Sequence, residues 1–292
     1  MYLRRLGIWT AQLDYQPAHV ARQAAQKIEE LGFGAIWFPE STRREAFSNA
    51  SLLLCATRSI VIATGIAIAL ARDPVTTAAA HRTLTEAYPE RFLLGLGISH
   101  QITARLRGYD YPQNPAKAMR EYLLAMDNAP YDAAAPVSEP KRVIAALGPK
   151  MLATAKELAW GAHTYFVTPD HTHKAREILG EGKLLAVEQA VILNDQPSVA
   201  REIARQYMKR YLSLPNYINN LIRLGFDESD FANGGSDRLV DAIVCWGGLE
   251  TINSRLQEHF DAGADHVCIQ ALPTSPKDLP IREWEELASL LN

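Results

Sequence analysis

Polar residues gather where apolar runs of this sequence end. Glu40 and Ser41 follow one such run, and Ser99 and His100 follow another. His100 comes after a glycine-rich segment, so we expect it to face a pocket rather than the core. In parallel α/β folds ligands bind at the carboxyl ends of the strands, which makes these positions the first candidates for chemistry.

Gly148, Pro149 and Lys150 form a second kind of candidate, at a predicted strand-to-helix turn. Such a turn offers free backbone N–H groups and one cation, which suits a phosphate. An ordinary turn explains these residues equally well. Further candidates at or near predicted strand ends are Thr10, Gln12, His163, Thr164, Thr168 and Gln270.

Gly65 interrupts an otherwise continuous apolar run, from Ile60 to Leu70. A glycine inside a strand weakens it, and it often marks a bulge or the close approach of a ligand. Simple close packing is the alternative explanation. The residues alone leave both interpretations open.

Several chemistries lack their sequence signatures. The chain has no nucleophile elbow, no HExxH pair and no Walker loop. Metal binding needs several converging histidines or carboxylates, and Glu40 with His100 alone would not make a site, so no metal is expected. Cys55, Cys245 and Cys268 lie far apart in apolar runs, and we expect them to be small buried side chains.

The composition of the chain limits the classes of molecule that can be expected as partners. The chain has 292 residues, a formal net charge of −3 and 48% hydrophobic residues. This charge gives no electrostatic reason to expect nucleic acid or an anionic membrane surface as a partner. The longest apolar run is too short to span a bilayer, and no signal peptide is visible. We therefore expect a soluble, cytoplasmic protein that acts on a small molecule.

The positions above are best explained by a chain in which strands and helices alternate. Apolar, β-branched runs without polar alternation predict strands that are covered on both faces, as in a parallel sheet. Eight such strands are predicted, at residues 6–10, 35–38, 60–70, 92–98, 142–147, 162–168, 184–193 and 266–272. The alternation predicts an α/β fold, a (β/α)8 TIM barrel in one domain over 1–292. A doubly wound sheet is the alternative, but no GxGxxG follows the first strand.

A helical insertion is predicted before strand eight, over about 214–260. This segment contains no predicted strand, and prolines and glycine pairs divide it into short helices. It also carries the aromatic residues Tyr217, Phe226, Phe231 and Trp246. We expect it either to roof a substrate pocket or to pack against a second subunit.

Six segments in this order and spacing are typical of a known family. They are Ile36–Ser41, Ala63–Ile66, Arg72–Pro74, Arg91–His100, Ala145–Leu152 and Gly161–Tyr165. Through them the chain, from Leu6 to about Leu272, resembles the luciferase-like monooxygenase superfamily. Within it, the chain is similar to the actinobacterial group that uses the deazaflavin coenzyme F420.

The resemblance implies a TIM barrel with the deazaflavin in its mouth. In similar enzymes a non-proline cis peptide bond on strand three backs the tricyclic ring, and here it would join Gly65 to Ile66. Glu40 and Ser41 would approach the pyrimidine edge or the reacting carbon. The cofactor-binding residues implied in this way, with the phosphate near the last four, are Glu40, Ser41, Thr64, Gly65, Ile66, Gly97, Ser99, Gly148, Lys150, Met151 and Thr164.

The chain departs from the family pattern after strand two. Some deazaflavin dehydrogenases of this superfamily carry an Asp-His pair there, whereas this chain has Glu40 and Ser41. We hypothesise that His100, after strand four, replaces the missing histidine in proton transfer, with Glu40 as the second catalytic candidate. Trp160 and Gly161 also stand where many relatives have Asp-Gly.

The resemblance favours an oxidoreductase that moves a hydride between F420 and an organic substrate. Two alternatives remain. The first is a two-component flavin monooxygenase that receives FMNH2 from a partner reductase. The second is a barrel without catalytic activity that binds a flavin-like ligand. Barrels of this superfamily are often dimers, so we also expect a homodimer.

Overall fold

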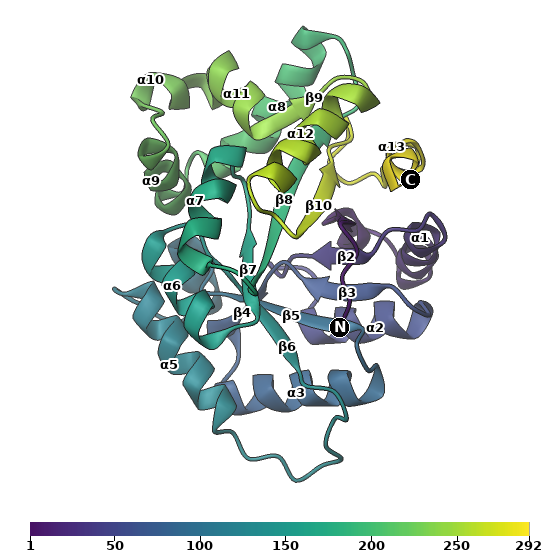
Figure 1. Cartoon of the computed structure of the whole chain (residues 1–292), viewed down its shortest axis with the longest axis vertical. Coiled ribbons are helices and arrows are strands. Elements are labelled where there is room, and N and C mark those ends of the chain that lie inside the picture. Colours follow the sequence, from purple (N-terminus) through teal and green to yellow (C-terminus); the bar gives the residue numbers. More distant parts are fainter. Residues whose placement is uncertain (292) are drawn as a thin grey trace.

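A computed structural model describes residues 1–291 of the chain. Its centre is a closed barrel of eight parallel strands, in which the last strand pairs with the first (Figure 1). The barrel strands are β1 (Leu6–Trp9), β2 (Ala35–Phe38), β3 (Val61–Thr64), β5 (Phe92–Gly97), β6 (Lys141–Ala145), β7 (Gly161–Thr164), β8 (Leu184–Ile192) and β10 (His266–Ala271). The (β/α)8 prediction is confirmed.

Helices cover the outside of the barrel. They are α1 (Ala18–Glu30), α2 (Ala46–Ala56), α3 (Pro74–Ala87), α4 (Gln101–Arg107), α5 (Pro115–Asp127), α6 (Pro149–Leu158), α7 (Pro169–Leu179), α8 (Pro197–Tyr211), α9 (Pro215–Arg223), α10 (Glu228–Phe231), α11 (Asp237–Ile243), α12 (Leu249–Asp261) and α13 (Ile281–Leu287). Many begin with proline, which costs no hydrogen bond in the first turn. Asp73, Asn114 and Thr168 cap three of these helices by accepting from backbone N–H groups.

The strand predicted over 60–70 is divided in two. β3 ends at Thr64, and a short strand β4 (Ala67–Ile68) pairs separately with β5. The peptide bond between them, Gly65–Ile66, is cis, as the resemblance implied.

Two predictions about local structure are wrong, and one helix was missed. A short strand, β9 (Val244–Trp246), lies in the segment predicted to have none, because the long strand β8 extends past the end of β7 and offers it a pairing edge. The helix α4 was not predicted; it is one short segment directly after His100. Cys55 is exposed, because it falls on the outer face of α2, whereas Cys245 and Cys268 are buried.

The barrel interior is filled below its mouth. Trp37 and His163 stack with ring centroids 4.5 Å apart, and Trp37 Nε1 donates to His266 Nε2 at 2.9 Å. Burial lowers the pKa of both histidines to about 4, so they are neutral at pH 7. Any ligand must therefore lie above this layer, at the carboxyl ends of the strands.

The insertion and the preceding helix α8 form a second, smaller core beside the barrel. Helices α8, α9 and α11 lie together at one end of the molecule (top of Figure 1, green). Their apolar side chains pack with Phe166 and Ala190 from the ends of β7 and β8. This packing places α8 and α9 next to the mouth of the barrel.

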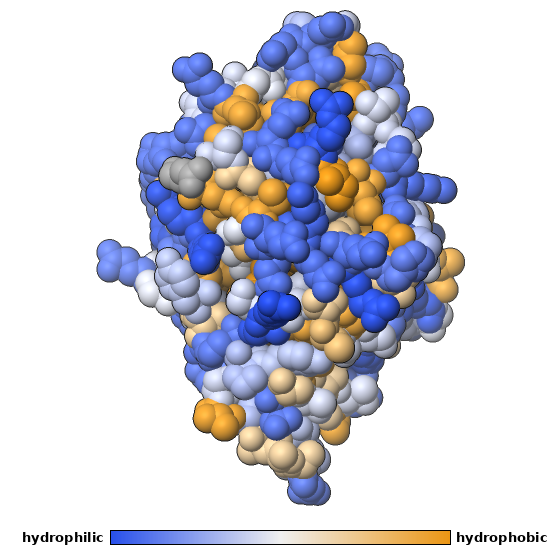
Figure 2. Space-filling model, turned by 90° about the vertical axis from the view of Figure 1, so that its right-hand side faces the viewer, coloured by the Kyte–Doolittle hydropathy of each residue, from blue (hydrophilic) through white to orange (hydrophobic). Residues whose placement is uncertain are grey.

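No helix within 1–291 combines the length and hydrophobicity needed to cross a bilayer. The face shown in Figure 2 has separate apolar patches among hydrophilic residues. Large exposed apolar side chains come from several elements, for example Val75, Ile102, Leu124 and Val199. Single exposed residues of this kind are ordinary for folded proteins.

Candidate active site

A cavity of about 540 Å³ opens at the carboxyl ends of the barrel strands. Helices α8 and α9 complete its wall, so the insertion does border the pocket. The structure brings together most of the predicted site residues in the lining of this cavity: Glu40, Ser41, Gly65, Ile66, Gly97, Ser99, His100, Gly148 and Met151.

Three predicted cofactor-binding residues lie outside the lining. Thr64 is fully buried, where its Oγ1 donates to Gly95 O at 2.7 Å and accepts from Gly95 N at 2.8 Å. Thr164 is also fully buried, and Lys150 is exposed on α6. Thr64 therefore holds strands together rather than facing a ligand.

One side of the cavity consists of residues with small or no side chains. We call Gly65, Gly97, Ala145, Ala146 and Gly148 the small-residue wall; all five line the cavity at or just after the ends of β3, β5 and β6. A Cβ atom on Gly97 would lie 2.7 Å from Ile66 Cδ1. The wall is smooth because no side chain larger than a methyl group projects from these positions.

Gly65 satisfies both interpretations left open by the sequence. It lines the cavity, and a Cβ atom there would lie 2.8 Å from Trp9 Nε1 and 3.1 Å from His163 Nε2. Trp9 Nε1 donates to Gly65 O at 3.2 Å. Close packing against Trp9 and His163 therefore requires the absence of a side chain at Gly65. The approach of a ligand from the cavity would require it as well.

His163 forms part of the floor of the cavity. Its Nδ1 lies 3.2 Å from Ala186 O, and a carbonyl can only accept, so the ring proton is on Nδ1. The imidazole is neutral, and its buried Nε2 has no partner among the described residues. Because this atom is covered by its neighbours, it belongs to the packed layer beneath the cavity.

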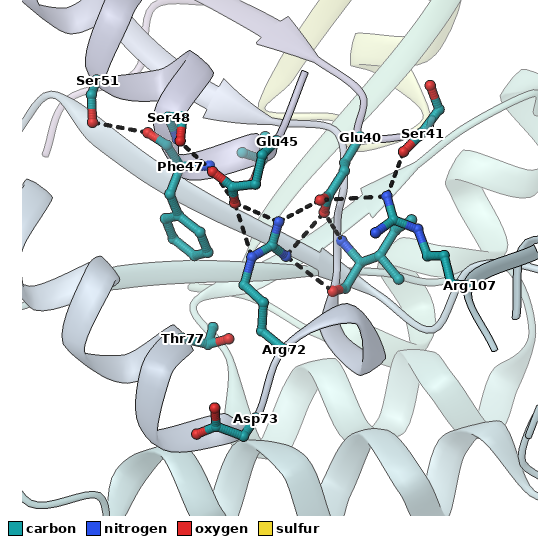
Figure 3. Close-up of polar contacts among 12 residues, drawn as sticks. Glu40, Ser41, Glu45, Phe47, Ser48, Ser51, Arg72, Asp73, Thr77 and Arg107 are labelled. Atoms are coloured by element: carbon teal, nitrogen blue, oxygen red, sulfur yellow. Dashed lines mark hydrogen bonds and ion pairs between the residues drawn. The ribbon is translucent and has the colours of Figure 1, made fainter. Parts of the chain in front are cut away.

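Glu40 is held by two arginines (Figure 3). Its carboxylate accepts from Arg72 Nη1 at 3.0 Å and from Ile68 N at 2.7 Å, and it lies 3.7 Å from Arg107 Nη2. Arg72 also contacts Glu45 at the start of α2. The Glu40 side chain is 1% exposed. These contacts fix the rim of the cavity, and the catalytic role of Glu40 stays a prediction.

His100 lies in the cavity lining, just before α4. Its ring centroid is 5.7 Å from that of Tyr217 on α9. Burial and the charge of Arg210 lower the pKa of His100, while a hydrogen bond with Asn216 opposes that change. The imidazole is therefore neutral at pH 7 and can accept a proton.

The Gly148 turn has a cationic neighbour that the sequence did not reveal. Arg223 Nη2 on α9 lies 3.6 Å from the position that a Gly148 Cβ would occupy. Asn220 is also on α9, and its buried Nδ2 has no partner within residues 1–291. A phosphate at the start of α6 would lie at the N-terminus of that helix and near the guanidinium.

The other side of the cavity is aromatic. We call Tyr165, Tyr207, Tyr211 and Tyr217 the tyrosine wall; all four line the cavity, from the end of β7 and from α8 and α9. Burial raises the pKa of Tyr211 to about 12 and the others well above 10, so the phenols are neutral. Of the four, only Tyr217 belongs to the segment expected either to roof the pocket or to pack against a second subunit. The four-residue spacing of Tyr207 and Tyr211 on one helix was the available signal for the others.

A carboxylic acid lies behind the tyrosine wall. Glu188 on β8 is fully buried, and burial raises its pKa to about 8, although Phe166 N donates to Oε2 at 3.1 Å. Its Oε1 has no partner in the described part of the chain. Glu188 is therefore protonated at neutral pH. In residues 1–291 no three metal-ligating side chains converge.

Comparison with known proteins agrees with this geometry. The family model for luciferase-like monooxygenases matches residues 5–266. A sequence comparison with curated proteins finds no match.

Solved structures share the fold at low sequence identity. An F420-dependent secondary alcohol dehydrogenase, bound to an F420–acetone adduct, has a TM-score of 0.77 at 16% identity, with all of both chains covered. The F420-dependent tetrahydromethanopterin reductase from Methanopyrus kandleri has a TM-score of 0.72 at 17% identity, over 98% of each chain.

A third similar structure binds a different cofactor. The oxygenating constituent of 3,6-diketocamphane monooxygenase from Pseudomonas putida, in complex with FMN, has a TM-score of 0.72 at 14% identity, over 98% of this chain and 96% of that one. At such identities the likeness is one of fold. From the family match over most of its length, we conclude that the chain belongs to the luciferase-like monooxygenase family.

Proposed function

We propose that this protein is an oxidoreductase that transfers a hydride between coenzyme F420 and a small organic substrate. The observation that carries the proposal is the neutral His100 in a cavity that also has a smooth wall for a flat ring. Hydride transfer to or from a carbon that bears oxygen is accompanied by proton transfer, and His100 can provide it.

The residues present fit a deazaflavin. Gly65, Ile66 and Gly97 would contact the ring. Gly148, with Arg223 behind it, would hold the phosphate of the tail. The coenzyme would supply the two-electron chemistry. Glu40 and Ser41 would border the reacting end, and Ser99 and Met151 would contact the same ligand.

FMN is the second candidate, and a specific observation favours testing it. The Gly148 turn and Arg223 suit the phosphate monoester of FMN as well as the phosphodiester of F420. An FMN-dependent enzyme would also need a reductase partner to supply FMNH2.

The decisive test is a fluorescence titration of the purified protein with oxidised F420 and, separately, with FMN. We expect micromolar binding of F420 and much weaker binding of FMN. A deazaflavin without the phosphate-containing tail serves as the ligand control, and Arg223→Gln as the protein control; each should weaken binding. Tight FMN binding would favour the monooxygenase. Binding of neither would overturn the proposal.

A further inference from the structure

Two arginines line the cavity beside the tyrosine wall. Arg210 is on α8, and Arg43 follows β2. Burial raises the pKa of Tyr211 to about 12, while a hydrogen bond with Tyr165 and the charges of Arg210 and Arg43 oppose this rise. Because the interaction between charges weakens with distance, both guanidinium groups must lie near the Tyr211 hydroxyl.

The spacing of residues along α8 turns Arg210 toward the cavity. The residues of this helix that line the cavity are Ile203, Gln206, Tyr207, Arg210 and Tyr211. Steps of three and four residues define one face of a helix, so Arg210 shares a face with the two tyrosines. Lys209, the preceding residue, is not part of the lining.

Arg210 differs from the other arginines of α8 in having no partner. Arg201 and Arg205 both pair with Asp237. Within residues 1–291 no carboxylate pairs with Arg210, and its guanidinium donates no hydrogen bond to another side chain. Arg210 therefore brings an uncompensated positive charge to the cavity.

The other charged groups of the lining are already paired. The buried Glu40 pairs with Arg72. Arg43 Nε donates to Asp14 Oδ2 at 3.2 Å, and its Nη1 donates to the Tyr15 hydroxyl at 2.9 Å. These two pairs leave the cavity with one positive charge in excess, that of Arg210, which fits a monovalent anion.

The hydroxyl groups of the tyrosine wall are largely occupied by one another. Tyr165 donates to Gln270 Oε1 at 2.8 Å, and Tyr207 donates to Tyr165 at 3.1 Å. The Tyr211 hydroxyl lies 2.7 Å from that of Tyr165. The wall therefore presents mainly ring surface to a substrate, and recognition of a charged group falls to the arginines.

The arginines lie across the mouth from the proposed phosphate site. That site, at Gly148, follows β6, whereas the pair of Arg43 and Asp14 joins the loops after β2 and β1. In the closed order of eight strands, β1 and β6 stand opposite each other. Burial lowers the pKa of His100 and the charge of Arg210 lowers it further, so Arg210 is also close to the proposed proton-transfer residue. This arrangement assigns the arginines to the reactant rather than to the coenzyme tail.

We propose that the substrate is a carboxylate, whose charged group pairs with Arg210 while Arg43 adds a second positive charge and the apolar part lies on the tyrosine wall. The inference rests on the oxidoreductase function proposed above and names its substrate class. A guanidinium can donate two parallel hydrogen bonds to a carboxylate, which fixes the orientation of the bound molecule.

The test is calorimetric titration of the full chain, without coenzyme, with three carboxylates and their uncharged amides. The carboxylates are butanoate, 3-phenylpropanoate and 2-naphthoate, which cover a range of sizes. For at least one pair, we expect the wild type to bind the carboxylate about tenfold more tightly than the amide. Arg210→Gln should remove this preference, and Arg210→Lys should restore part of it.

Lys209→Gln is the matched control. It removes one positive charge from the same helix outside the cavity lining, so the preference for the carboxylate should remain. Thermal melts establish that each variant folds. Three results would overturn the proposal: no carboxylate binds more tightly than its amide, Arg210→Gln keeps the preference, or Lys209→Gln loses as much of it as Arg210→Gln.

Titrations of the same variants with F420 separate this inference from the proposed function. If F420 binds but the wild type prefers no carboxylate, the coenzyme assignment stands and the substrate class falls. If the preference is as expected but F420 does not bind, the carboxylate site stands and the deazaflavin function falls. If Arg210→Gln weakens F420 binding as much as carboxylate binding, Arg210 holds the coenzyme tail and the substrate class falls.

Discussion

The two walls of the cavity are built in different ways. The small-residue wall is main chain at the ends of β3, β5 and β6, and its shape is that of the barrel itself. The tyrosine wall is made of side chains, two of them from α8 and one from α9 of the insertion, and hydroxyl contacts hold it together. A backbone wall cannot change without moving the barrel, whereas a side-chain wall changes with single substitutions. This division suits a constant coenzyme on one side and a selected substrate on the other.

The largest loss of stability is expected from a substitution that breaks the ion pair of Glu40 at the rim of the cavity. Arg72→Met leaves the Glu40 carboxylate buried with only one arginine, 3.7 Å away. Removal of one partner from a buried ion pair typically costs about 3 kcal/mol or more, so we expect a loss of that size in the free energy of unfolding. Denaturant melts measure it.

Arg120→Met is the matched control for this change. Arg120 pairs with Glu157 on the surface, where solvent screens the interaction, and its loss should have little effect. Equal losses for the two variants would mean that the Glu40 cluster does not support the rim.

Gly65→Val tests the small-residue wall directly. The new side chain would collide with Trp9 and His163 or fill the ring position, so affinity for the coenzyme should fall about 100-fold, or about 2.7 kcal/mol. Gly248→Ala is the control, because Gly248 has an ordinary φ of −76° and a Cβ atom there would meet only Asp195 Oδ1, at 3.7 Å. Unchanged affinity in Gly65→Val would show that the ring does not lie on this wall.

His100→Asn probes the place where the two walls meet. We expect turnover to fall roughly 100-fold, with the dissociation constant of the coenzyme unchanged, because proton transfer is lost and the ring contacts are kept. The measurement requires a substrate found by screening carbonyl compounds. Full turnover in the variant would assign proton transfer to another group.

The two walls also differ in how far the sequence predicted them. Apolar runs that alternate with helical segments predict the barrel. The parallel strands of a barrel all end at the same mouth, so Gly65, Gly97 and Gly148, at or near strand ends, come together there. The tyrosines come together only because α8 and α9 pack on β7 and β8. That contact depends on tertiary packing, which residue spacing along the chain does not encode. Arg223 escaped prediction for the same reason.

The direction in which side chains point explains why three predicted cofactor-binding residues lie outside the cavity lining. Successive residues of a strand face opposite sides, so Thr164 points away from the cavity when its neighbour His163 lines it. Thr64 has the same relation to Ala63, which packs inside the barrel. Lys150 lies on the outer side of the first turn of α6, and chain order alone does not fix that side.

The smallest effect on stability is expected from Glu188→Gln, a substitution behind the tyrosine wall. Its pKa is about 8 in the folded protein, against an ordinary value of 4.5. Between these values the folded state keeps a proton that the unfolded state releases, so the free energy of unfolding falls as the pH rises. Glu188 contributes at most about 1.4 kcal/mol per pH unit.

Glu188→Gln cannot ionise and should remove this slope, whereas Glu181→Gln, an exposed control, should keep it. Denaturant melts at about pH 6 and about pH 7 measure both slopes. Equal slopes in the wild type and Glu188→Gln would mean that the carboxyl group finds a charge partner behind the wall.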